Sequence, residues 1–185
     1  RRGNAFLRAH RDLTGVHPDR GVLDPFDQDV ALAGDPHAGA VADGVLEAGG
    51  QVIGVIIPTM NTAALAYVGL TQMDVVEGMH ARKARMHELA DGYIAMPGGF
   101  GTFDELFETV TWAQTGAHEK PVGLLNVKDY YVPLLAAIDH AVHEGFIFQE
   151  HRDVLFIDAD PHVLLDKMER YEHPRAAVKR WMREE

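Results

Sequence analysis

The sequence predicts an α/β fold with a parallel sheet, on three observations. Short apolar, β-branched runs alternate with stretches in which apolar residues have helical spacing, and this alternation is typical of parallel sheets. A glycine-rich stretch, residues 96–105, separates one apolar run from the helical pattern that follows. The 185 residues suit one domain with a substantial core. Together these observations predict a single-domain, Rossmann-like, doubly wound parallel sheet flanked by helices.

Residues 1–36 form an atypical N-terminal segment that carries few structural signals. Residues 5–11 are compatible with a short helix, and residues 16–21 and 23–27 have the composition of turns. Residues 29–34 suggest a strand followed by a turn. No function follows from this segment alone.

From residue 39 onward the pattern is regular. Helical spacing over residues 39–48 stops at a pair of glycines, which is a natural C-terminal cap. Residues 51–57 are almost wholly apolar and β-branched, so we expect a strand buried on both faces. A connection over residues 59–73 leads to a short strand that ends at residues 75–76 and then to a helix over residues 77–89.

The second half repeats this alternation and ends in a charged tail or exposed helix, residues 172–185. We expect buried strands at residues 93–96 and 120–127 and a last short strand at residues 154–157. We expect helices over residues 103–115, over residues 130–143 and from Asp160-Pro161 onward.

The glycine-rich stretch has the composition of a phosphate site. Glycines let backbone N–H groups approach a ligand closely, and the next helix directs its unpaired N–H groups and positive dipole end to the same place. Thr102 is able to cap that helix or to donate its hydroxyl to a phosphate oxygen, and Glu105 completes a Thr-x-x-Glu capping box in form. A tight turn with a capping box and no ligand explains the same pattern. In the phosphate-site interpretation, the glycines that approach the ligand are Gly98, Gly99 and Gly101.

On the helix over residues 77–89, four residues at spacings of three and four share about one side: Met79, Arg82, Lys83 and Met86. We expect Met79 and Met86 in the core. Arg82 and Arg85 are compatible with solvated charge or, for Arg82, with binding of a carboxylate or phosphate by the planar guanidinium.

Two residues of the helix over residues 103–115 allow two interpretations each. Glu108 lies three positions after Glu105, so it either faces the same cleft or lies in solvent. Trp112 is more typical of a core residue than of a platform for a stacked base.

The string Pro97-Gly98-Gly99-x-Gly101-Thr102-x-x-Glu105 resembles the signature of the LOG family, the cytokinin riboside 5′-monophosphate phosphoribohydrolases, often labelled "possible lysine decarboxylase". A second family-like string covers residues 79–86. The resemblance extends over about residues 39–170, with further matches at residues 39–43, 49–56, 112–114, 120–126 and 130–131.

This resemblance implies an N-glycosidase that converts a cytokinin-type or AMP-type nucleoside 5′-monophosphate into free base and ribose 5-phosphate. It places the catalytic residues at Arg82 and Glu105, and substrate or phosphate binding at Met79, Lys83, Gly98, Gly99, Gly101 and Thr102. It also implies a homodimer. The family's expected glycine-rich loop near the N-terminus has only residues 33–39 as a counterpart, so a non-catalytic nucleotide-binding or phosphate-binding protein of the same fold is the alternative.

Composition narrows the class of partner. The net charge of −11 argues against nucleic acid or an anionic membrane as the main partner, and no apolar run has the length of a membrane span. The chain has no cysteine, which suits a cytoplasmic protein. Its 11 histidines are scattered, so we expect no metal site. We expect no cofactor, because the full dinucleotide fingerprint is absent and no lysine stands out as a Schiff-base residue.

Overall fold

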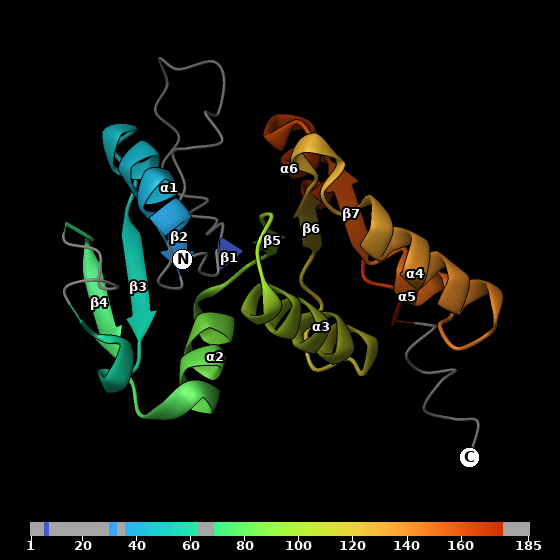
Figure 1. Ribbon diagram of the computed structural model, residues 1–185, viewed down its shortest axis with the longest axis horizontal. Helices are drawn as coiled ribbons and strands as arrows, with labels where there is room; N and C mark the ends of the chain where they lie inside the picture. Colours follow the sequence, from blue (N-terminus) through green and yellow to red (C-terminus); the bar gives the residue numbers. More distant parts are fainter. Residues whose placement is uncertain (1–5, 8–29, 33–35, 63–68, 176–185) are drawn as a thin grey trace. The chain divides into compact units, whose positions relative to one another are not determined.

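The computed structural model of the chain describes residues 6–7, 30–32, 36–62 and 69–175 (Figure 1). The chain divides into two compact units, residues 1–93 and residues 94–185. Both units contain strands and helices, and parallel strand pairs occur in each. The predicted α/β class with flanking helices is therefore confirmed, whereas the single domain stays a prediction.

The first unit contains a three-stranded parallel sheet in the order β2-β3-β4, formed by β2 (Val30–Leu32), β3 (Val52–Ile56) and β4 (Gln72–Val75). Helix α1 (Pro36–Glu47) connects the parallel strands β2 and β3 and lies against both (Figure 1). Its buried side chains pack on β3 in a small apolar core of Ala42, Val45 and Val52. Strand β3 is almost wholly buried, as its apolar sequence predicts.

Helix α1 ends at the predicted pair of glycines. Gly49 has a φ of +89°, which favours glycine because it has no Cβ. Its N–H donates to the carbonyl of Leu46 at 3.1 Å, and the N–H of Gly50 donates to the carbonyl of Val45 at 2.9 Å. These two hydrogen bonds form a Schellman motif, so the predicted C-terminal cap is confirmed.

Two predictions for the first unit differ from the structure. Phe6 and Leu7 form strand β1, so the short helix expected over residues 5–11 is wrong at its described residues. The connection expected over residues 59–73 contains a 3₁₀ turn, Pro58–Met60, and the first two residues of β4. The predicted turns at residues 16–21 and 23–27 lie outside the described residues, as does the turn after β2.

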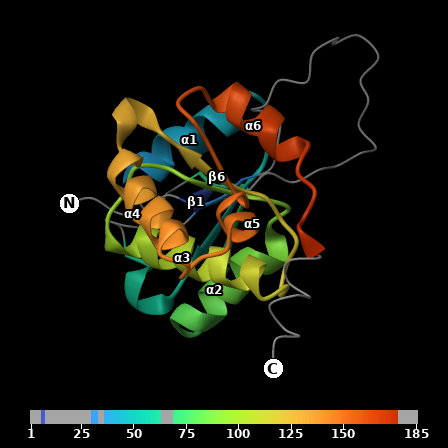
Figure 2. The same ribbon diagram turned by 90° about the vertical axis from the view of Figure 1, so that its right-hand side faces the viewer.

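The second unit contains the strands β5 (Tyr93–Ala95), β6 (Val122–Leu125) and β7 (Leu155–Asp158) as neighbours in this order; β5 begins at the last residue of the first unit. Strands β6 and β7 are parallel, with Val122 opposite Leu155. The helices are α3 (Phe100–Gln114), α4 (Val132–His143), α5 (Gln149–Arg152) and α6 (Pro161–Glu169), and α5 lies beside α4 (Figure 2). The short helix α5 had no sequence prediction.

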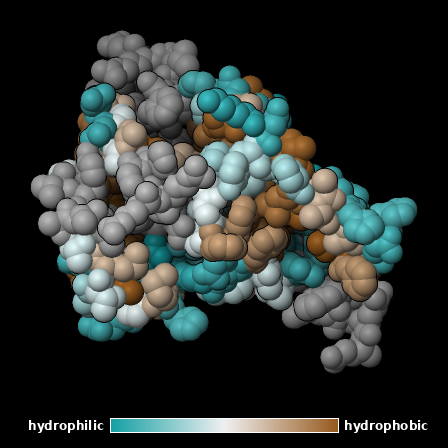
Figure 3. Space-filling view, in the orientation of Figure 1, coloured by the Kyte–Doolittle hydropathy of each residue, from teal (hydrophilic) through white to brown (hydrophobic). Residues whose placement is uncertain are grey.

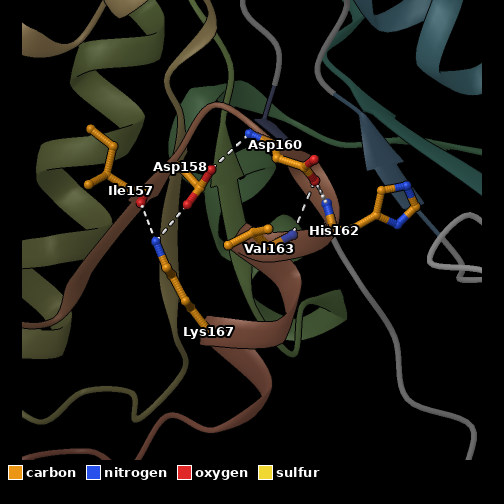
Figure 4. A network of polar contacts seen from close by, with 6 residues as sticks. All are labelled: Ile157, Asp158, Asp160, His162, Val163 and Lys167. Atoms are coloured by element: carbon orange, nitrogen blue, oxygen red, sulfur yellow. Dashed lines mark hydrogen bonds and ion pairs between the residues drawn. The ribbon is translucent and has the colours of Figure 1, made fainter.

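Helix α6 begins where the Asp160-Pro161 pair predicts. The Asp160 carboxylate accepts hydrogen bonds from the backbone N–H groups of His162 and Val163, at 2.8 and 3.2 Å, and so caps the helix (Figure 4). The Nζ of Lys167 donates to the Asp158 carboxylate at 2.7 Å. This ion pair and the hydrogen bond from the Asp160 N–H hold the pKa of Asp158 below its ordinary value. The network fixes α6 at the end of β7.

A buried histidine joins the second half of α3 to the loop that follows the helix. The N–H of Lys120 donates to Nδ1 of His118 at 3.1 Å, so Nε2 carries the proton and donates to the carbonyl of Thr109 at 2.9 Å. His118 is 9% exposed. Burial, followed by the charges of Lys120 and His173, lowers its pKa, while the hydrogen bond to Thr109 acts in the opposite direction.

The segment after α6 contacts the same region. Nε2 of His173 lies 3.1 Å from the carbonyl oxygen of Ala113, and the guanidinium of Arg175 donates two hydrogen bonds to the carboxylate of Glu119, at 2.7 and 2.5 Å. Residues 176–185 of the predicted charged tail lie outside the described residues.

Exposed apolar side chains lie among hydrophilic ones on the face drawn in Figure 3. In the second unit, the exposed large apolar side chains include those of Phe100, Phe107, Val132, Phe146 and Val163. No described helix combines the length and the apolar composition that a membrane span needs.

Candidate functional site

The glycine-rich turn leads directly into α3. Gly99 is the N-cap residue, with φ −98° and ψ −156°, and the N–H of Phe103 donates to its carbonyl at 3.1 Å. The helix therefore begins at Phe100, and Thr102 is its third residue. The predicted capping by Thr102, and with it the Thr-x-x-Glu capping box, is wrong, because the cap position belongs to a glycine without a side chain. The first N–H groups of a helix have no partner inside the helix.

The Thr102 hydroxyl is a buried polar group at the head of α3. Its side chain is 0% exposed, and Oγ1 has no hydrogen-bond partner among the described residues. A Cβ added to Gly98 would lie 2.1 Å from this oxygen. Gly98 is thus the residue that allows the turn to fold against the hydroxyl. A buried hydroxyl without a hydrogen bond is costly, so this oxygen is suited to contact a polar ligand at the helix terminus.

Glu105 lies one helical turn after Thr102 on the buried face of α3 and is 5% exposed. The same face carries Leu106 and Thr109, and the Thr109 hydroxyl donates to the backbone carbonyl of Glu105 at 2.7 Å. Carboxylates are seldom buried to this degree unless they have partners. Glu108 and Trp112 are both half-buried, so exposure does not decide between their two interpretations.

Helix α2 (Gly78–Leu89) buries Arg82, which is 2% exposed. Its Nε donates to the carbonyl of Val55 at 3.1 Å, near the carboxyl end of β3. The interpretation of Arg82 as solvated charge is therefore wrong. Met86 is buried as predicted, but Met79 is 39% exposed. Its expected place in the core is wrong, because it lies in the first turn of α2. Lys83 is half-buried.

Arg85 lies on another side of α2 and has a different environment. Its Nε donates to the Asp74 carboxylate on β4 at 2.7 Å, and its Nη1 to Glu88 at 3.2 Å. The hydrogen bond from Arg85 is the main cause of the lowered pKa of Asp74, and it raises the pKa of Arg85. Asp74 was not singled out from the sequence. The pair joins α2 to β4, which is a structural role.

The chain matches one protein-family model, described as "Possible lysine decarboxylase", over residues 38–168. A cytokinin riboside 5′-monophosphate phosphoribohydrolase, LOG1 of Arabidopsis thaliana, is 42% identical over 144 residues, which are 77% of this chain and 68% of the relative. The chain belongs to the LOG family.

Two further LOG proteins are similar. LOG3 of Arabidopsis thaliana, a cytokinin riboside 5′-monophosphate phosphoribohydrolase, is 44% identical over 143 residues, 76% of this chain and 66% of the relative. The probable cytokinin riboside 5′-monophosphate phosphoribohydrolase LOGL2 of Oryza sativa subsp. japonica is 43% identical over 150 residues, 80% of this chain and 62% of the relative. The chain thus spans roughly three fifths of LOGL2.

In this LOG chain the predicted site residues occur in both units. Arg82, Met79 and Lys83 belong to the first unit. The predicted site residues in the second unit are Glu105, Gly98, Gly99, Gly101 and Thr102. The structure brings the second set together at the head of α3, whereas the partnership of Arg82 with Glu105 stays a prediction. The described residues contain no group of three or more His, Asp or Glu side chains placed to hold a metal ion.

Two residues beside the turn had no predicted role. The Tyr131 hydroxyl donates to the carbonyl of Met96 at 2.6 Å, and the Tyr130 hydroxyl donates to the carbonyl of Gly98. Tyr131 is 0% exposed, and burial raises the pKa of its phenol. The sequence signal was the family-like Tyr-Tyr pair, which does not by itself indicate contact with a turn more than 30 residues earlier.

Proposed function

We propose that this chain hydrolyses the N-glycosidic bond of a purine nucleoside 5′-monophosphate and releases the free base and ribose 5-phosphate. The observation that carries the proposal is the buried carboxylate of Glu105, one helical turn behind a glycine-rich helix terminus with a buried hydroxyl. The LOG relatives have names that describe this activity on cytokinin nucleotides.

The phosphate end of the substrate would bind at the head of α3. The N–H groups of the first helical turn and the positive end of the helix dipole favour an anion there. Gly98, Gly99 and Gly101 would let the phosphate approach the backbone, and the Thr102 hydroxyl would donate to a phosphate oxygen. A chain with a net charge of −11 needs such a local site to bind an anionic substrate.

The ribose would then lie near Glu105. Glu105 lies three positions after Thr102, which is about 4.5 Å along a helix axis. As the bond from C1′ to the base nitrogen breaks, positive charge develops on the ribose, and a carboxylate stabilises this charge or orients the attacking water. The water oxygen bonds to C1′, and the departing nitrogen gains a proton. In this proposal Arg82 orients Glu105 through its planar guanidinium and contacts the substrate together with Met79 and Lys83.

A product assay tests the proposal. The purified protein is incubated with AMP and with its N6-isopentenyl analogue, and free base is measured by chromatography. We expect release from at least one of them, and the ratio of the two rates assigns AMP-type or cytokinin-type specificity. Glu105→Gln keeps the size of the side chain and should lower kcat about 10²- to 10³-fold. The control is Asp104→Asn on the exposed neighbour, which should retain activity.

Two results would contradict the proposal. Undiminished release by a folded Glu105→Gln protein would remove Glu105 from the chemistry. Nucleotide binding by the parent protein without any release of base would instead assign the chain to the non-catalytic alternative.

We also propose that the chain forms a homodimer and acts in the cytoplasm. The dimer is supported by Phe100 and Phe107, which are 94% and 47% exposed. Seven residues apart, they share one side of α3, and exposed aromatic side chains of this kind are typical of interfaces. Sedimentation equilibrium measures the mass, and a monomer at all concentrations would contradict the dimer. The lack of cysteine supports the cytoplasmic location, which imaging of a tagged protein would test.

A further inference from the structure

Two consecutive tyrosines, which follow the glycine-rich turn by more than 30 residues, donate hydrogen bonds to the backbone of that turn. The buried Tyr131 donates to the carbonyl of Met96, and the half-exposed Tyr130 donates to the carbonyl of Gly98. The two rings pack edge to face with centroids 5.1 Å apart. Each tyrosine hydroxyl therefore donates to a different backbone carbonyl, and the two carbonyls belong to the residues immediately before and after Pro97.

The loop that presents these tyrosines has an unusual backbone. Lys128 and Asp129 have φ values of 53° and 58°, the left-handed region that residues other than glycine seldom adopt. Asn126 fixes the loop, because its Oδ1 accepts a hydrogen bond from the N–H of Tyr131 at 2.8 Å. Backbone strain of this kind persists where the surrounding contacts determine the geometry and is frequent at functional sites.

The hydrogen bond from Tyr130 determines which way one peptide group of the turn faces. The carbonyl of Gly98 and the N–H of Gly99 belong to the same planar trans peptide, so they point in opposite directions. While the carbonyl accepts from Tyr130, the N–H of the N-cap residue Gly99 points away from the tyrosine. A peptide between two glycines has little steric resistance to rotation. Rotation would replace a donor by an acceptor oxygen at the head of α3.

We propose that Tyr130 and Tyr131 are positioning residues that hold the turn with the N–H of Gly99 available to the phosphate of the substrate. This inference rests on the proposed function for the identity of the anion. The tyrosines act through the backbone of the turn. Tyr131 fixes the entry to the turn at Met96, and Tyr130 fixes the orientation of the Gly98–Gly99 peptide.

The test compares two hydroxyl deletions in the same unit. Tyr130→Phe removes the hydrogen bond to Gly98. Tyr171→Phe is the matched control, because the buried hydroxyl of Tyr171 has no hydrogen-bond partner among the described residues. Three quantities are measured for both variants and the parent: the Kd for ribose 5-phosphate by calorimetry, kcat and KM for the nucleotide that the parent cleaves, and hydrogen–deuterium exchange of peptides covering residues 98–103.

For Tyr130→Phe we expect Kd and KM to rise roughly 3- to 10-fold, as for the loss of one hydrogen bond. We expect kcat to change less than twofold and exchange over the turn to become faster. Tyr171→Phe should match the parent in all three quantities. A purely structural role would lower stability without separating KM from kcat. Tyr131→Phe, which unpairs the Met96 carbonyl, should raise KM in the same direction if the variant folds.

The outcomes separate this inference from the proposed function. A parent that binds ribose 5-phosphate but releases no base contradicts the proposed function, and weaker binding by Tyr130→Phe then still supports the positioning role. An active parent whose Tyr130→Phe variant has unchanged Kd, KM and exchange overturns the positioning role alone. A parent that neither binds ribose 5-phosphate nor releases base overturns both.

Discussion

Adding one methyl group to the glycine-rich turn should have very different effects on stability at two adjacent positions. At Gly98 a Cβ would lie 2.1 Å from Thr102 Oγ1 and 2.9 Å from Thr102 Cβ. At Gly99 it would meet nothing within 4 Å. Neither residue has a φ in the left-handed region, so the difference between the two substitutions is one of packing and not of backbone strain. Gly98→Ala and Gly99→Ala therefore form a matched pair.

The magnitude follows from the geometry. Carbon atoms pack at about 3.5–4.0 Å, so the Thr102 hydroxyl would need to move by more than an ångström. Thr102 is fully buried in α3 and, as a β-branched residue, has few rotamers. Overpacking of this kind costs about 1–3 kcal/mol. Gly99→Ala should change stability by less than about 1 kcal/mol, because the restriction of the unfolded chain by alanine offsets the lower preference for alanine at the N-cap position. The difference between the two variants is then roughly 1–3 kcal/mol.

Thermal unfolding and urea titration measure this difference. For a chain of this size, Gly98→Ala should lower Tm by about 2–12 °C relative to the parent. Thr102→Ala removes the nearest atom, so the cost of Gly98→Ala should fall by about 1 kcal/mol in that background. Equal stabilities of the two alanine variants, or additive effects of Gly98→Ala and Thr102→Ala, would refute the packing of Gly98 against the hydroxyl.

Two further predictions concern α2 and the buried histidine. Arg82→Lys keeps the charge but loses the planar guanidinium, and it should lower kcat/KM roughly 10- to 100-fold. Arg85→Lys, at the paired surface position, should change kcat/KM little. Steady-state kinetics with AMP compares the two variants. Because burial depresses the pKa of His118 below 6.5, its ordinary value, the unfolded chain binds the extra proton more readily, so this histidine favours the folded state above about pH 6.5 and destabilises it as the pH falls. The amide of His118→Gln can still donate to Thr109, so this variant should show a smaller fall of the urea midpoint of unfolding between pH 7 and 5 than the parent. An unchanged pH profile would show that His118 does not cause the fall.

The parts of the fold that were predictable from sequence depend on local rules. The cap at Gly49-Gly50 and the helix start at Asp160-Pro161 require only a few neighbouring residues, and both were confirmed. The predicted start of α3 was wrong by three residues, because the prediction placed Thr102 at the cap position. A glycine at the N-cap can begin a helix without a capping side chain.

The burial of side chains depended on contacts distant in the sequence. Arg82 and Arg85 lie three residues apart on one helix, but the first binds a carbonyl of β3 and the second a carboxylate of β4. No periodicity within α2 distinguishes them. The hydrogen bonds of Tyr130 and Tyr131 likewise join residues 32 and 35 positions apart. The family resemblance identified these strings of residues, and only the fold gave the tyrosines a role.

The left-handed pair at Lys128 and Asp129 has a consequence for how this loop can vary among homologous chains. Glycine and asparagine adopt such φ values at little cost, so several residue types should be tolerated at both positions. A change in the number of residues is different. One inserted residue would change the spacing between Asn126 and Tyr131 on which the loop's own hydrogen bond depends, and so would displace both hydroxyls from the glycine turn. We therefore expect homologues to differ here in composition and to agree in loop length.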